Sequence, residues 1–242
     1  RARGPDPGDA YDARDWKEED EPLGTLVAKI SPWLAMTNLV KNVGSEVPRA
    51  SGGTTPWRFD CFEFVIVNRI YAYWRTMSRT EFNLKFNPLT LGYNADMAEK
   101  THLSWEPPIL ASKPGDKPYR KGETKPTMKD GAVTYEIERI PVDKSWDELV
   151  RDAPIGTQII WSNKDTVAKC TKDGTLPFCD YMNENVTKVG QDQYSAHPFG
   201  IVSAQRIIDE MATAPFGGDR KKVSKDYVRQ NVYISALRYA KK

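Results

Sequence analysis

Cys61 stands where a polar loop gives way to an apolar segment. Residues 51–56 are rich in Ser, Gly and Thr, and apolar residues at helical spacing then run from Phe59 to about Thr80. The spacing predicts a helix with Cys61 near its start, where unpaired backbone N–H groups and the helix dipole stabilise a thiolate. The same N–H groups could hold an oxyanion if the sulfur attacked a carbonyl group. A buried structural cysteine is the alternative, and Cys61 by itself favours it.

A nucleophilic thiol needs a base or an ion-pair partner, and a second segment offers both. The chain has two histidines: His102 lies in a loop, whereas His197 lies in a strand-like segment. If residues 190–191 form a two-residue hairpin turn, Glu184 lies directly opposite His197, with β-carbons roughly 5 Å apart on one side of the sheet. A three-residue loop would instead pair Glu184 with Pro198. The alternative is a surface Glu–His pair that contributes little.

Composition limits the classes of protein. A chain of 242 residues with 39% hydrophobic residues and many aromatic ones fits one sizeable domain. Its 35 basic and 33 acidic residues nearly cancel, which does not favour nucleic acid as a partner. No apolar stretch is long enough to span a bilayer, so no membrane partner is expected. No signal peptide is visible and the chain begins without Met, which predicts a fragment of a larger protein or a processed product.

The three cysteines suggest a division of roles. Cys170 and Cys179 flank the turn-forming pair Asp173-Gly174, so they could close a small disulfide loop and leave Cys61 as the thiol. The bridge is expected in an exported protein and would stay open in a reducing cytosol. With two histidines in the chain and neither beside this pair, a zinc site is disfavoured, and we predict no metal and no cofactor.

The sequence divides into an acidic arm or linker over residues 1–21 and a single catalytic domain over 22–242, with a long polar insertion around 107–128. Helices followed by a mostly antiparallel set of strands predict the α+β class. The patterns predict helices over 23–43 (bent or restarted at Pro32), 59–80, 145–150, 203–211 and 223–242, and strands over 133–140, 158–161, 184–189 and 193–202.

Four segments together resemble the bacterial spore-coat transglutaminase family. They are Asp60-Cys61 at the start of an apolar helix, Asn-Glu-Asn-Val over 183–186, Gly-Gln-Asp-Gln-Tyr-Ser-Ala-His-Pro-Phe-Gly-Ile over 190–201, and Gln-Arg-Ile-Ile-Asp over 205–209. The resemblance implies a papain-like, NlpC/P60-type core in which the nucleophilic cysteine begins a central helix packed on an antiparallel sheet.

Residue by residue, the resemblance implies Cys61 as nucleophile, Glu184 as its acidic partner and His197 as the flanking histidine. Asp60 falls where the family carries an assisting glutamate. Two features depart from the family: Pro198 removes a donor after the histidine, and the segment between Cys61 and Glu184 is longer, which predicts a different substrate channel.

The expected reaction is transfer of a glutamine acyl group to a lysine amine through a thioester on the cysteine. Trp57 and Trp161 are candidate walls that exclude water from substrate, although each could equally be a core residue. The alternatives are a glutamine deamidase, a cysteine peptidase or amidase, and a non-catalytic binding module. Expected partners are proteins carrying Gln and Lys, together with an immunity or inhibitor protein if the chain is a secreted or delivered bacterial toxin or effector; a spore-coat role is the other context.

Overall fold

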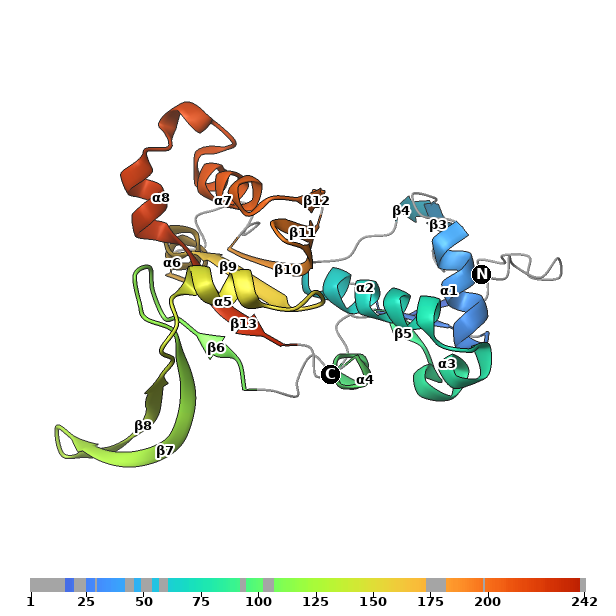
Figure 1. Cartoon of the computed structure of the whole chain (residues 1–242), viewed down its shortest axis with the longest axis horizontal. Helices are drawn as coiled ribbons and strands as arrows, with labels where there is room; N and C mark the ends of the chain where they lie inside the picture. Colours follow the sequence, from blue (N-terminus) through green and yellow to red (C-terminus); the bar gives the residue numbers. More distant parts are fainter. Residues whose placement is uncertain are drawn as a thin grey trace. The chain divides into compact units, whose positions relative to one another are not determined.

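The computed structural model describes residues 16–19, 25–28, 30–41, 46–48, 54–56, 61–91, 95–101, 107–172, 182–197 and 199–239 (Figure 1). The chain divides into two compact units, Arg1–Leu103 and Ser104–Lys242. Helices and antiparallel strands occur in both, which confirms the predicted α+β class. The single catalytic domain over 22–242 stays a prediction.

The described part of the first unit consists of short strands and helices. Strands β1, β2 and β5 form a three-stranded antiparallel sheet in the order β1-β2-β5, and β3 pairs with β4. The elements are β1 (Trp16–Glu19), β2 (Thr25–Ala28), α1 (Pro32–Lys41), β3 (Glu46–Pro48), β4 (Thr54–Pro56), α2 (Cys61–Thr76), α3 (Arg79–Phe86), β5 (Thr90–Leu91) and α4 (Ala95–Lys100).

The core of this unit lies along one side of α2. Ile66 and Ile70, four residues apart on that helix, are buried with Phe82 and Phe86, which have the same spacing on α3. The two phenylalanine rings lie 4.7 Å apart between centroids. Burial of these large side chains, at about 1.5–3 kcal/mol each, holds α2 in place.

Two predicted boundaries in this unit were wrong. The helix expected over 23–43 is a strand, β2, followed by a helix that begins at Pro32, where a fixed φ suits the first helical position. The helix expected to reach Thr80 ends at Thr76, because Ser78 caps the next helix in a reciprocal capping box with Glu81. The arm predicted over 1–21 includes β1, which pairs with β2.

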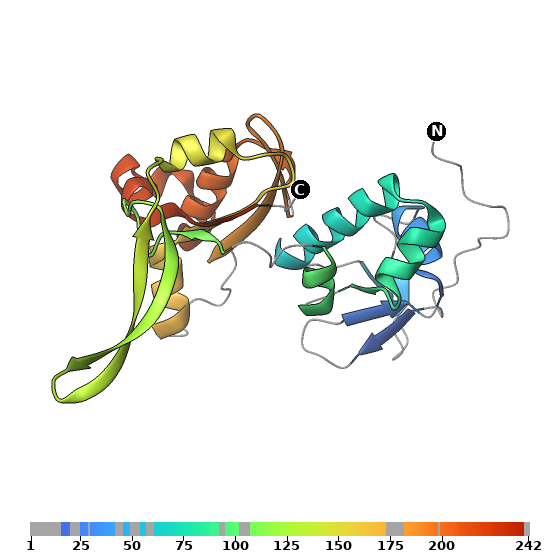
Figure 2. The ribbon, with the colours of Figure 1, turned by 60° about the horizontal axis from the view of Figure 1, so that its bottom comes forward.

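The second unit is built on an eight-stranded antiparallel sheet in the order β12-β11-β10-β9-β13-β6-β7-β8. Strands β7 and β8 run past the rest of this sheet as a long hairpin (Figure 2). The elements are β6 (Ile109–Leu110), β7 (Tyr119–Lys129), β8 (Ala132–Pro141), α5 (Trp146–Asp152), β9 (Gln158–Asn163), α6 (Lys164–Lys172), β10 (Asn183–Gly190), β11 (Gln193–Ala196), β12 (Gly200–Val202), α7 (Ala204–Thr213), α8 (Lys225–Asn231) and β13 (Val232–Arg238), with 3₁₀ turns η2 (Ala214–Phe216) and η3 (Arg220–Lys222).

Helix α7 covers part of one side of the sheet. Its Ile207 and Met211, four residues apart, are fully buried in a cluster with Ile159 of β9 and Val186 of β10. Strands β8, β9 and β10 and helices α5 and α7 agree closely with the predicted ones, whereas α6 was not predicted and the strand expected over 193–202 is divided into β11 and β12. Ser145 and Glu148 form the capping box predicted for α5.

Two predictions for the second unit need correction. The polar stretch around 107–128 is not a loop throughout, because it contains β6 and most of β7. The helix expected over 223–242 ends at Asn231, and Val232–Arg238 is instead strand β13 between β9 and β6. A seven-residue segment with this apolar pattern fits both the helical period and the two-residue period of a strand. Pairing with β9 on one edge and β6 on the other favours the strand.

The longest helix among the described residues, α2, has 16 residues. None of the described helices has the length and apolar character that crossing a membrane requires.

Candidate active site

Cys61 is the first residue of α2 and is half-buried. The first N–H groups of a helix have no acceptor within the helix, and the dipole of a helix this long favours negative charge there. Glu63 follows in the same turn and is buried. Residues two apart on a helix do not face each other, so the carboxylate and the sulfur point to different sides of α2.

Arg69, two turns further along α2, attaches this helix to the rest of the first unit. Its Nη1 donates a 3.0 Å hydrogen bond to the backbone oxygen of Thr101, directly after α4. Burial lowers the pKa of the Arg69 guanidinium, and the nearby Tyr73 acts in the opposite direction. The contact joins two elements that are distant in sequence and stabilises the position of the helix that carries Cys61.

Glu184 lies on β10, directly opposite Trp161 of β9. Glu184 is 3% exposed and Trp161 is 7% exposed. Val186, two residues on, is on the same side of the sheet as Glu184 and belongs to the apolar cluster under α7. The structure therefore places the predicted acid and one predicted aromatic wall side by side. The Trp161 indole N–H is buried and has no hydrogen-bond partner among the described residues.

The hairpin register predicted for Glu184 and His197 was wrong by one residue. Val186 pairs with Ala196, whereas a turn at residues 190–191 would have paired it with Ser195. The turn is at residues 191–192, and a bulge at Val189 shifts the register. A three-residue loop gives this same pairing of Val186 with Ala196, and the register that would set Glu184 opposite His197 is not formed.

His197 is half-buried and lies in the turn directly after β11, which ends at Ala196. The turn, and not the pleat of the strand, therefore directs its side chain. Asn185 lies on the opposite side of the sheet from Glu184, because neighbouring residues of a strand alternate.

The side of the sheet that carries Asn185 holds polar residues that the sequence analysis missed. Gln158 Nε2 donates to Asn185 Oδ1 at 2.8 Å, and both residues are buried. Ser162 Oγ lies 2.6 Å from Asn183 Oδ1 and 2.6 Å from Ser235 Oγ. The alternation of the polar residues Asn183, Asn185 and Thr187 in the sequence indicated this polar side of β10. The sequence analysis selected only Glu184, which lies on the other side.

Lys188 anchors β10 to α5. Its ammonium group donates to the backbone oxygens of Val150, Arg151 and Ala153 at 2.7, 2.9 and 2.8 Å. These carbonyls end the helix, where the dipole favours a cation. Lys188 is 4% exposed, and burial lowers its pKa. Three charge-assisted hydrogen bonds hold the strand that carries Glu184.

The predicted catalytic residues belong to different units. Cys61 is in Arg1–Leu103, whereas Glu184 and His197 are in Ser104–Lys242. Their convergence in one cleft stays a prediction. Asp60, Trp57 and Cys179 lie outside the described residues, as does the side chain of Cys170, so the predicted disulfide lies outside them too.

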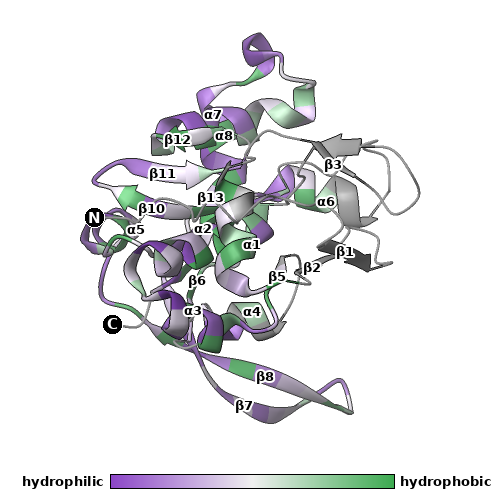
Figure 3. Cartoon of the chain, turned by 90° about the vertical axis from the view of Figure 1, so that its right-hand side faces the viewer, coloured by the Kyte–Doolittle hydropathy of each residue, from purple (hydrophilic) through white to green (hydrophobic). Residues whose placement is uncertain are grey.

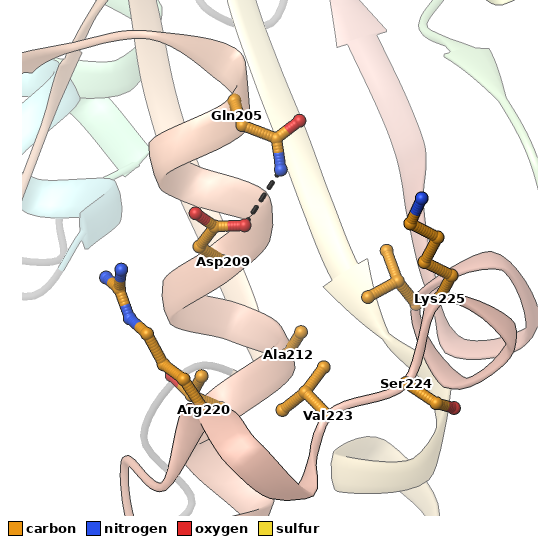
Figure 4. Close-up of a pocket in the computed structure, with 9 residues that line it drawn as sticks. Gln205, Asp209, Ala212, Arg220, Val223, Ser224 and Lys225 are labelled. Carbon is orange, nitrogen blue, oxygen red and sulfur yellow. Dashed lines mark hydrogen bonds between the residues drawn. The ribbon is translucent and has the colours of Figure 1, made fainter.

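A hollow of about 400 Å³ lies in the second unit beside α7 and the segment leading into α8 (Figure 4). Gln205 donates to Asp209 at 2.8 Å at its edge, and Arg220 and Lys225 contribute cations. No predicted catalytic residue lines it. Among the residues that the structure describes, no three His, Cys, Asp or Glu side chains are grouped to hold a metal ion.

No family model and no curated protein matches this chain. Among solved structures, the chain is similar to a transglutaminase from Geobacillus stearothermophilus without its C-terminal extension. The identity is 16%, the TM-score is 0.48, and the match covers 95% of this chain and 76% of the other. This is a weak likeness of overall fold, from which we draw neither an activity nor a site.

Proposed function

We propose that this protein is a protein-glutamine γ-glutamyltransferase with a papain-like, NlpC/P60-type core. The observation that carries the proposal is the position of Cys61 as the first residue of the 16-residue helix α2. Backbone N–H groups beside a thiol at this position stabilise its thiolate. The same groups can hold the oxyanion that forms when the thiolate attacks a carbonyl group. The motif resemblance around 183–209 selects glutamine as the acyl donor.

Glu184 is the proposed acid and base. Its carboxyl group is buried beside Trp161, an environment in which a carboxyl group can exchange protons with substrate without competition from bulk water. His197 would assist from the turn after β11, and Asp60 would assist beside the thiol.

The proposed reaction has two stages. The Cys61 thiolate attacks a glutamine carboxamide, the C–N bond breaks, and ammonia leaves with a proton from the Glu184 carboxyl group. A lysine amine then attacks the thioester and gives its proton to the Glu184 carboxylate. The C–S bond breaks, which releases the isopeptide product and restores the thiolate. Attack by water instead of the amine gives deamidation.

Mass spectrometry of a glutamine-containing protein incubated with a primary amine tests this proposal. Wild-type protein should incorporate the amine with loss of one ammonia, and Cys61→Ala should not. Glu184→Gln should reduce turnover by about 10²–10⁴-fold, since it removes an acid–base group. Glu123→Gln, on the exposed strand β7, is the matched control and should retain activity.

The products separate the alternatives. A mass gain of one unit without amine incorporation indicates a deamidase, and chain cleavage indicates a peptidase. An unchanged substrate, together with slow labelling of the Cys61 thiol at pH 6, indicates a binding module and would contradict the proposal. Proteins carrying Gln and Lys are the proposed partners. An inhibitor protein and a secreted or delivered bacterial context remain proposals of the same kind.

A further inference from the structure

Strand β8 is the last strand in the order of the eight-stranded sheet. It pairs with β7 on one edge and, among the strands that the structure describes, with none on the other. A strand in that position presents a row of backbone N–H and C=O groups without ladder partners. Those groups can pair with an extended segment of another chain.

Several of the usual devices that protect such an edge are missing from β8, although Glu136, Glu138 and Arg139 are charged. It has ten residues, about twice the length of a typical strand, and its one proline, Pro141, is the last of them. It contains no lysine, and the register shift in the hairpin lies on β7, between Lys121 and Thr124. The outer edge is therefore long and able to accept a partner strand.

The two sides of β8 differ in chemistry. Val133, Tyr135, Ile137 and, at the end of the row, the basic Arg139 point to one side, and Tyr135 is 72% exposed there. In Figure 3 the ribbon of β8 carries both hydrophobic and hydrophilic residues. Glu136, Glu138 and Ile140 point to the other side, where Lys125 of β7 is directly opposite Glu136 and lies 3.5 Å from Glu138 in an exposed ion pair. No ion pair to Glu136 exists among the described residues.

This alternation defines the segment that fits the edge. In an antiparallel pair, directly opposite residues share a side, so apolar residues suit positions facing Val133, Tyr135 and Ile137. Basic residues suit positions facing Glu136 and Glu138, where opposite charges attract. A complementary strand therefore alternates apolar and basic residues.

A second copy of β8 is disfavoured at this edge in three of the possible registers. A twofold axis through Glu136 or Glu138 sets that glutamate against itself, and an axis through Ile137 sets Glu136 against Glu138. Like charges directly opposite each other destabilise a strand pair. An axis through Tyr135 avoids these contacts and makes self-association a distinct outcome of the test.

We propose that the outer edge of β8 binds an extended segment of a partner protein in which apolar and basic residues alternate. Main-chain hydrogen bonds would supply most of the affinity, and the two sides of the strand would supply the selection. The binding needs neither Cys61 nor Glu184, so it stands or fails separately from the proposed catalysis.

Binding of a fluorescent peptide to the full chain tests the proposal. The probe is a seven-residue peptide of alternating lysine and valine. Three control peptides are compared with it. The first has glutamate in place of lysine, the second has alternate backbone N–H groups blocked by methylation, and the third has the same composition in an order that does not alternate. The alternating lysine peptide should bind, and each control should bind at least about fivefold more weakly.

Two charge-matched variants locate the site. Glu136→Lys should weaken binding of the lysine peptide about fivefold or more and improve binding of the glutamate peptide. Glu123→Lys, on β7, makes the same change in net charge away from the outer edge and should leave both affinities unchanged. Circular dichroism of each variant checks that the fold is retained.

Three outcomes would overturn the proposal. The first is equal binding of all four peptides, or of none of them. The second is an equal effect of the substitutions at Glu136 and Glu123. The third is a dimer in sedimentation that Glu136→Lys leaves intact and that excludes the peptide, which would assign the edge to a second copy.

Discussion

One sheet in the second unit contains two regions with the same backbone pairing and opposite surroundings. Around β9 and β10, side chains on both sides of the sheet are buried; along β7 and β8, both sides are exposed. Antiparallel pairing is therefore compatible with either environment, and the side chains determine what each region can do.

Several buried polar groups in the first region form hydrogen bonds within the protein. Gln158 pairs with Asn185, and Lys188 donates to three carbonyls. In the hairpin, water can take the place of any lost partner, so the Thr127–Thr134 hydroxyl pair at 2.9 Å contributes little to selecting the structure. A buried region of this kind suits fixed acid–base groups, and an exposed strand suits recognition of another chain.

The largest difference should come from truncating one isoleucine in each region. Ile159→Ala, in the buried cluster, should lower the free energy of unfolding by about 2–5 kcal/mol, because it removes contacts and leaves a cavity. Ile137→Ala, on the exposed hairpin, should change it by less than about 0.5 kcal/mol. Urea denaturation measures both, and equal losses would mean that the hairpin is also packed in solution.

A smaller difference is expected from two lysines. Lys188→Met leaves three buried carbonyl oxygens without their donor and should cost about 1.5–3 kcal/mol in the free energy of unfolding. Lys125→Met removes an exposed ion pair to Glu138 at 3.5 Å and should cost less than about 1 kcal/mol. If denaturation midpoints showed the two variants to be alike, Lys188 would not be the anchor of α5.

The smallest effect concerns Tyr227 of α8, whose hydroxyl lies 3.5 Å from Asn163 at the end of β9 and 3.2 Å from Asp165. Burial, with the charge of Asp165 adding to it, raises the pKa of Tyr227 to about 12. Between pH 10 and that value the unfolded chain binds fewer protons, so stability falls as pH rises through this window.

Thermal unfolding followed across this alkaline range should therefore show a steeper loss of stability for wild type than for Tyr227→Phe. The difference should be modest, since Tyr227 is only half-buried. Parallel curves for the two proteins would show that its hydroxyl is not protected by the fold.

The predictions that succeeded depended on short-range signals. The capping box of Ser145 and Glu148 involves residues within one helical turn. The alternation over 184–189 identified β10. The hairpin register failed, because the bulge at Val189 depends on how two strands fit together and not on the composition of the turn.

The sequence by itself determined where α5 and α7 begin and that β8, β9 and β10 are extended, since caps and side-chain periodicity act between near neighbours. Only the tertiary structure decided that Val232–Arg238 is a strand between β9 and β6, that Glu184 lies beside Trp161, and that no other strand in the described part of the chain pairs with the outer edge of β8. Those outcomes join residues far apart in the chain, and their free energy comes from burial and strand pairing that no local window contains.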